Sequence, residues 1–145
     1  MSFWFKLLTL PANEAGVASF EAMSGVPIEL TVQLKELVWR SNNLTAPSKP
    51  TDGTVSQQVW YCVSLYLTSV HMDINYISEA APADVRTWVI DDQPTTSIDD
   101  MWQNQPEANR KIRGLPSFGS DPTSPSEMLL DDVRIVRGKS NVCGI

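Results

Sequence analysis

Alternation of apolar and polar residues is the clearest pattern in the chain, and it predicts β-strands. Between Ile28 and Lys35 each apolar residue is followed by a polar one, which is the period of a strand with one buried face. The segment from Phe3 to Leu10 is aromatic and apolar and stops at a proline. Its composition predicts a strand or an anchoring arm over residues 1–11.

The stretch from Gln58 to Ile77 supports two interpretations. Apolar residues recur there at helical spacing, so a helix over residues 57–71 is one alternative. The stretch is also rich in Val, Tyr, Trp, Thr and Ile, which favours a strand, and its second half, from Val70, alternates. We therefore predict strands here, and a further strand over Val85–Ile90.

Two segments carry the signals of short helices. Asn13 suits a helix N-cap and a glycine follows at position 25, which predicts a helix over residues 13–23. The segment from Pro106 to Gly114 has Pro in its first turn and Gly past its end. The last apolar segment, residues 127–138, has features of both a helix and a strand, and the sequence leaves it open.

These elements predict a mainly β fold, a sandwich or jelly roll, with a few short helices. The alternative is an α+β fold in which residues 57–71 are helical. We expect a single domain over residues 1–145. Polar, proline-containing stretches predict long loops at residues 41–54 and 114–126, and residues 139–145 are expected to form a C-terminal tail.

Composition and charge narrow the classes of protein. The 145 residues are 42% hydrophobic and 19% charged, with a net charge of −6. No apolar run reaches the roughly 18 residues of a membrane-spanning helix, and the acidic balance argues against broad nucleic-acid binding. Lys6 interrupts the apolar N-terminal run, unlike the pattern of a secretory signal. We therefore expect synthesis in the cytoplasm without a signal peptide.

The two cysteines are too few for a disulfide scaffold. Cys62 lies in an apolar run, which predicts a buried thiol. Cys143 lies in the expected C-terminal tail. A bridge between the two is an alternative that the sequence leaves open.

Acidic pairs and the single histidine are the candidates for chemistry. Carboxylates are the ligands that Ca²⁺ and Mg²⁺ prefer, but Asp also ends strands and forms turns, which is the interpretation we adopt. His71 is interpreted as structural. We expect no catalytic residue, no metal and no cofactor. The carboxylates that would bind a metal, if one were held, are Asp91, Asp92, Asp99, Asp100, Asp131 and Asp132.

Aromatic and basic residues supply candidates for a protein interface. Trp102 lies in a polar segment, which is typical of an exposed anchor. Acids gather between Asp73 and Glu107 and bases after residue 109. We interpret this pattern as an ordinary solvated surface, and charge matching with a like copy or a complementary partner is the alternative. The interface candidates are Phe3, Trp4, Phe5, Trp102, Arg110, Lys111 and Arg113.

One short segment carries a resemblance to a known family. The sequence from Leu130 to Ile135, Leu-Asp-Asp-Val-Arg-Ile, resembles the closing strand of some β-jelly-roll carbohydrate-binding modules. The resemblance implies a β-sandwich that binds a glycan, and an exposed aromatic platform and a requirement for Ca²⁺ are the observations that would favour it.

The function that these features favour is that of a non-enzymatic structural or assembly protein, a subunit of a larger protein assembly. A surface that is polar but poor in charge suits broad protein contacts, so self-association or a larger complex is expected. A virion component, such as a capsid-decorating, head–tail or tail-associated protein, is one concrete form. The alternatives are a carbohydrate-binding β-sandwich module and a small hydrolase that uses Asp residues and His71.

Overall fold

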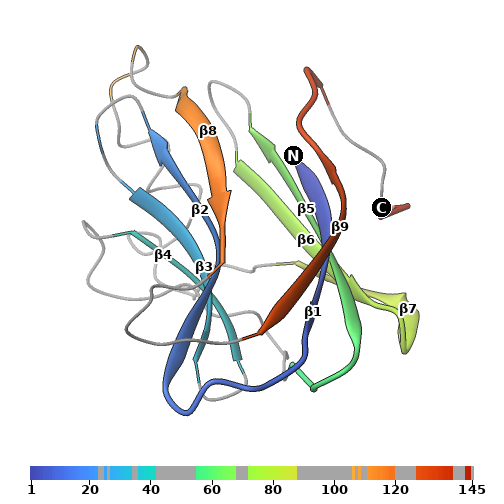
Figure 1. Ribbon diagram of the computed structural model, residues 1–145. Coiled ribbons are helices and arrows are strands. Elements are labelled where there is room, and N and C mark those ends of the chain that lie inside the picture. The colour runs from blue at the N-terminus through green and yellow to red at the C-terminus, as the bar shows by residue number, and fades with distance from the viewer. Residues whose placement is uncertain are drawn as a thin grey trace, which may run out of the picture.

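The protein is built from β-strands in two antiparallel sheets (Figure 1). The computed structural model describes residues 1–22, 25, 27–33, 36–41, 55–67, 72–87, 106, 108, 111–119, 127–138 and 143–144. These residues contain no α-helix, and the fold is mainly β, as the alternation in the sequence predicts. Within the same residues, no helix has the length and apolar character needed to cross a bilayer.

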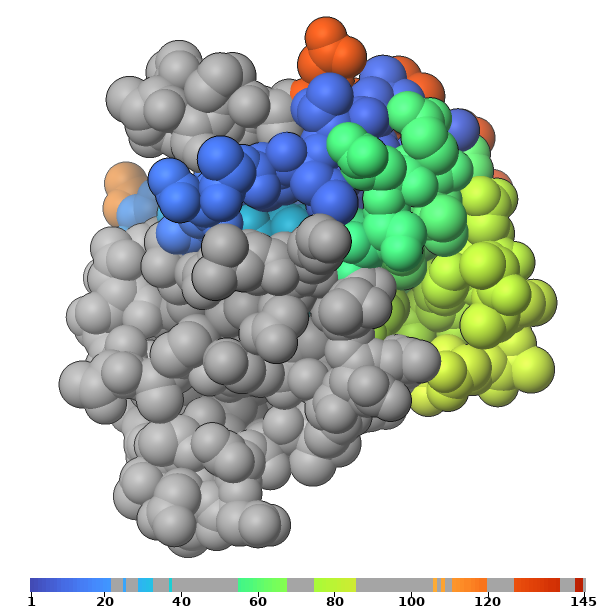
Figure 2. All heavy atoms as spheres, turned by 90° about the horizontal axis from the view of Figure 1, so that it is seen from below, coloured from blue at the N-terminus to red at the C-terminus, as the bar shows by residue number. Residues whose placement is uncertain are grey.

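In the described part of the chain, the larger sheet has five strands. In chain order they are β1 (Ser2–Leu7), β5 (Trp60–Leu67), β6 (Met72–Ser78), β7 (Ala81–Thr87) and β9 (Met128–Arg134). Their order across the sheet is β7-β6-β5-β1-β9. Figure 2 shows the same arrangement from below, with β6 and β7 at the right of the molecule and β5 and β1 beside them.

The smaller sheet has four strands among the residues that the structure describes. They are β2 (Glu14–Ala22), β3 (Pro27–Gln33), β4 (Glu36–Ser41) and β8 (Ile112–Phe118). Their order across the sheet is β4-β3-β2-β8. β3 confirms the strand that alternation predicts from Ile28. Among the described strands, β8 and β9 are therefore both at an edge, one in each sheet.

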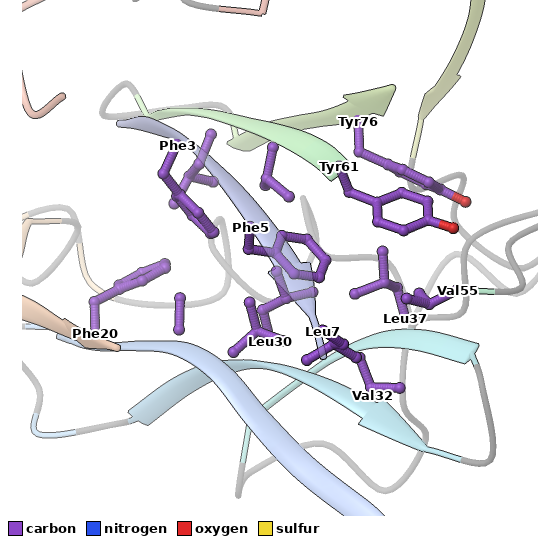
Figure 3. Packing of buried hydrophobic residues seen from close by; sticks show 14 residues of the cluster. Phe3, Phe5, Leu7, Phe20, Leu30, Val32, Leu37, Val55, Tyr61 and Tyr76 are labelled. Atoms are coloured by element: carbon purple, nitrogen blue, oxygen red, sulfur yellow. The ribbon is translucent and has the colours of Figure 1, made fainter. Parts of the chain in front are cut away.

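Side chains from both sheets meet in one core (Figure 3). Phe3, Phe5 and Leu7 of β1 are fully buried there, opposite residues such as Leu30 of β3. Phe5 stacks on Tyr61 of β5, with ring centroids 5.6 Å apart. Burying a large apolar side chain of this kind contributes about 1.5–3 kcal/mol, so this shared core holds the two sheets together.

The N-terminal segment is an inner strand of the larger sheet. β1 pairs with β5 on one side, where Phe3 lies opposite Val63, and with β9 on the other, where Phe5 lies opposite Leu130. The strand predicted in this segment is therefore confirmed for residues 2–7, and both of its edges are paired.

The helix expected over residues 13–23 is wrong, because residues 14–22 form β2. The register of β2 against β3 shifts between Gly16 and Ala18, which marks a bulge. The bulge turns residues on both sides of it toward the core, and Ala15, Val17, Ala18 and Phe20 are all buried. The cap signals at Asn13 and Gly25 are therefore not the ends of a helix.

The other uncertain segments are also strands where they are described. β5 confirms the strand predicted in the middle of the chain, so the helix over residues 57–71 is wrong. β8 occupies residues 112–118. The helix expected over residues 106–114 and the loop expected over 114–126 are therefore wrong for that strand. β9 makes residues 128–134 a strand. Most of the predicted loop at 41–54 lies outside the described residues, although Ser41 ends β4.

Cys62 and Cys143 form a disulfide, with Cα atoms 5.6 Å apart and a sequence separation of 81. The free thiol expected at Cys62 is therefore wrong. The bridge lies in a small cluster with Ile77 of β6, and Trp4 of β1 packs against it. It fixes Cys143 to the face of the larger sheet that points away from the main core. Closing a loop of this length contributes about 4 kcal/mol.

Candidate functional site: the β8–β9 face

Strand β9 carries apolar side chains that the core does not cover. Among the described strands it pairs with β1 alone, and every residue of β9 after Met128 is exposed. Apolar residues concentrated on one edge are typical of a protein contact, unlike single residues scattered over a surface. The exposed apolar residues of β9 and the segment after it are Leu129, Leu130, Val133, Ile135 and Val136, each between 38% and 53% exposed.

A bulge interrupts β9. Ser2 pairs with Arg134 but Trp4 pairs with Asp131, so β9 has an extra residue there. Asp132 has a φ of 47°, in the left-handed region that Asp tolerates better than most residues. The Asp132 backbone N–H donates to Asp131 Oδ1 at 2.8 Å, and Arg134 Nε donates to Asp132 Oδ1 at 2.9 Å. The acidic pair therefore shapes the bulge.

Strand β8 is the corresponding edge of the smaller sheet, and it is also irregular. Its register against β2 shifts between Ser19 and Glu21. Gly114 has a φ of 73°, a left-handed conformation that favours glycine. Leu115 follows it and is 82% exposed, the most exposed of the large apolar side chains described. Bulges on edge strands hinder the addition of another strand, so this edge offers side chains to a partner.

An apolar groove of about 390 Å³ lies between the two edges. Its lining includes Phe20 of β2, Leu65 of β5 and Ile112 of β8, and Ile135 and Val136 after β9 also line it. The volume lies in the range of sites that bind small molecules or inserted side chains.

Met1 is held against this groove by backbone hydrogen bonds. Its amino nitrogen donates to the Leu65 carbonyl oxygen at 2.7 Å, and the Leu65 N–H donates to the Met1 carbonyl oxygen at 2.7 Å. Burial lowers the pKa of the Met1 amino group below its ordinary value. The wall formed by β5 and Met1 is therefore fixed in place.

We call residues 112–118 and 128–138 the β8–β9 face. Its charges balance once Glu21 of the neighbouring β2 is included. Arg113 Nη1 lies 3.6 Å from Glu21 Oε1 of the neighbouring β2, and Arg134 pairs with Asp132. These pairs are exposed and add little stability. With Glu21 included, the bases are Arg113, Arg134 and Arg137, and the acids are Glu21, Asp131 and Asp132. The net charge of −6 is therefore carried by other parts of the chain.

The residues predicted to form an interface lie in different parts of the structure. Phe3 and Phe5 are fully buried in the core, so they are not available to a partner. Trp4 is partly buried beside the disulfide. Lys111 is exposed just before β8, and Arg113 is exposed within it. The remaining candidates, Trp102 and Arg110, lie outside the described residues.

In the described part of the chain, the residues considered as metal ligands or catalytic groups do not form a site. Asp131 and Asp132 lie in the β9 bulge. No group of three His, Cys, Asp or Glu side chains among the described residues is placed to hold a metal ion. Outside the described residues lie His71, Asp91, Asp92, Asp99 and Asp100.

A second surface lies on the side of the larger sheet that points away from the main core. Lys6 of β1 is paired with Trp60 of β5, and Lys6 Nζ lies 4.8 Å from the centroid of the Trp60 ring, a cation–π contact. Trp4 lies on the same face, because residues two apart on a strand point the same way. Glu79 Oε1 accepts a hydrogen bond from the Trp60 backbone N–H at 3.0 Å. Aromatic rings near polar groups suit contact with an amphipathic ligand.

Sequence reasoning missed Leu115, Ile135, Val136 and Arg137 as site residues. Leu115 lies in a segment rich in Gly, Pro and Ser, which predicts a loop. The adjacent pair Leu129–Leu130 is a signal that could have pointed to this edge. Two neighbouring residues of a regular strand point to opposite faces, so one of the two leucines must point away from the core.

No family model, no curated protein and no solved structure matches this chain. Its function is therefore inferred from the residues and geometry of the surfaces described above.

Proposed function

We propose that the protein is a non-enzymatic assembly protein that binds another protein through the β8–β9 face. The observation that carries this proposal is the concentration of exposed apolar side chains on β9 beside an apolar groove. These side chains are between 38% and 53% exposed, so each one that a partner covers completely contributes about half of the 1.5–3 kcal/mol of full burial. A few such residues supply much of the affinity of a stable interface.

A protein fits this face better than a small molecule does. The groove is lined by Ile135 and Val136, but the exposed residues continue along β9 to Leu129. A strand rises about 3.3 Å per residue, so the exposed residues of β9 continue past the residues that line the groove, whose volume is about 390 Å³. A small ligand would leave Leu129, Leu130 and Val133 in water.

The disulfide supports a place of action outside a reducing cytosol. Disulfides persist in secreted proteins and on the surfaces of cells and virions, and the Cys62–Cys143 bridge is buried. A virion component, such as a capsid-decorating, head–tail or tail-associated protein, is the form of assembly protein that we favour. The synthesis in the cytoplasm that we expect from the sequence is compatible with it, since the bridge can form after the particle is released.

Site-specific photo-crosslinking in cells that make the protein tests the proposal. A photoreactive residue is placed at Val136, on the β8–β9 face, or at Val85 of β7, at the other edge of the larger sheet. The two valines are 50% and 46% exposed, so they are matched in type and in exposure. We expect a discrete protein adduct from position 136 in high yield, and little from position 85. Equal yields at the two positions would contradict the proposal.

A carbohydrate-binding module is the second candidate function, and the Trp60 surface favours it. Trp60 and Trp4 share one face of the larger sheet, and Lys6 and Glu79 contact Trp60. A glycan array is the direct screen. If a glycan binds, Trp60→Ala is expected to abolish binding while Val136→Asp leaves it unchanged. Binding that survives Trp60→Ala would rule out this surface as the glycan site.

A further inference from the structure

The most exposed apolar side chain of the β8–β9 face lies next to its apolar groove. Gly114 and Pro116 of β8 line the groove, and Leu115 stands between them. Leu115 is 82% exposed, so it does not fill the groove of its own chain. The face therefore presents an apolar projection and an apolar recess side by side on one strand.

A projection beside a recess is the arrangement that a two-fold dimer uses. In such a dimer the same patch of both copies meets, so each projecting residue contacts the recess of the other copy. Resting on the proposed function, we infer that the partner on the β8–β9 face is a second copy of this chain, with Leu115 of each copy inserted into the groove of the other.

The charge distribution supports a like partner. Two copies that each carry a net charge of −6 repel one another over most of their surface. The β8–β9 face carries little of this charge, since with Glu21 of β2 its acids and bases balance. Two of its pairs lie within the chain, Arg113 with Glu21 and Arg134 with Asp132. Two such faces meet with little like-charge repulsion. A strongly acidic or basic partner would find no complementary charge there.

The irregular edges support contact by side chains. The bulge at Asp132 and the left-handed Gly114 interrupt the regular row of backbone donors and acceptors on β9 and β8. Edge strands with bulges are poor templates for an added strand. The dimer is therefore formed by exchange of Leu115, with no continuous sheet across the two copies.

Sedimentation equilibrium of the purified full chain measures this association. We expect a dimer at micromolar concentration for the wild type and for the matched control Val85→Asp, and a monomer for Leu115→Asp and for Val136→Asp. The milder Leu115→Ala is expected to raise the dimer dissociation constant about 100-fold, since about tenfold is lost at each of two symmetric contacts. Leu115 is exposed, so circular dichroism should show every variant folded.

Mixed crosslinking fixes the geometry of the contact. One preparation carries Leu115→Cys and a second carries Val136→Cys, and the two are oxidised together. We expect a disulfide-linked product that contains one chain of each, formed faster than when Val85→Cys replaces Val136→Cys. Equal rates in the two mixtures would overturn the exchange of Leu115.

The possible failures of the dimer and of the proposed function are distinguishable. A wild type that remains monomeric at high micromolar concentration overturns the dimer. So does a dimer that survives both Leu115→Asp and Val136→Asp. If the crosslinked adduct from position 136 then contains a different protein, the proposed function stands with another partner. If position 136 yields no more adduct than position 85, both fall.

Discussion

Strands β5 and β9 are the two neighbours of β1, yet they use apolar residues in opposite ways. In β5, the residues from Tyr61 to Leu65 are all buried, because the smaller sheet covers one face and the disulfide cluster part of the other. In β9, every residue after Met128 is exposed. Equal pairing to β1 therefore does not give equal burial.

The difference between the two strands shows that apolar residues in a strand of this fold do not by themselves indicate burial. Apolar residues in β5 stabilise the folded chain, whereas those of β9 remain exposed to water and are available to another molecule. A substitution in β5 should therefore change the free energy of unfolding, while a comparable one in β9 should change binding.

The largest expected effect comes from placing a carboxylate in β5. Val63 is fully buried, so Val63→Asp buries an unpaired carboxylate and is expected to cost about 4 kcal/mol or more. Val133→Asp in β9 is the matched control, because Val133 is 41% exposed, and it should change stability by about 0.5 kcal/mol or less. Urea denaturation measures both.

If Val63→Asp does not fold at all, Val63→Ala supplies the measurement, with an expected loss of about 2–3 kcal/mol from lost burial and the remaining cavity. A similar cost at Val63 and Val133 would remove the distinction between the two strands.

The next largest effect comes from removing the disulfide on the outer side of β5. The variant with both Cys62→Ala and Cys143→Ala is expected to lose about 4 kcal/mol, because the bridge closes a long loop. Thermal unfolding of the wild type with and without a thiol reductant provides the control, and the reductant should have no effect on the double variant. An unchanged midpoint after verified reduction would show that the bridge does not stabilise the fold.

Part of the fold was predictable from sequence because two inner strands carry a local strand signal. β3 alternates from Ile28, and β5 has strand composition, so both are predicted correctly. β2 is not, because the bulge near Gly16 resets its alternation. A local pattern cannot show such a bulge, since it depends on pairing with another strand.

The candidate site was not predictable for a related reason. The groove is lined by segments as distant as Met1, Leu65, Ile112 and Val136, and no local pattern shows that they meet. Position at the edge of a sheet also depends on strand order, which the sequence leaves open. The Cys62–Cys143 pairing likewise joins residues whose separation is 81.

A smaller effect is expected at the irregular edge of β8. Gly114→Ala should cost about 1–2 kcal/mol, because a left-handed φ of 73° is strained for a residue with a Cβ. No atom lies within 4 Å of the added Cβ, so the cost comes from the backbone alone. Gly114→Asn is the matched variant and should cost less, since Asn tolerates this conformation better. Equal costs for Ala and Asn in urea denaturation would contradict this explanation.

The smallest effect is expected at the ion pair of the β9 bulge. Arg134→Ala should lower stability by about 0.5 kcal/mol or less, because the side chains of Arg134 and Asp132 are 58% and 41% exposed. Urea denaturation at low and at high salt should show that even this difference shrinks as salt screens the pair. A loss above about 1 kcal/mol would mean that the bulge needs the pair.

The most direct test of the contrast between β5 and β9 is the free energy of unfolding of one triple variant. It combines Val133→Asp, Ile135→Asp and Val136→Asp, and is measured by urea denaturation at a concentration where the wild type is monomeric. If these residues serve a partner, the value should lie within about 1.5 kcal/mol of the wild type. A loss of several kcal/mol, comparable with that of Val63→Asp, would place them in the core and contradict the β8–β9 face as a binding surface.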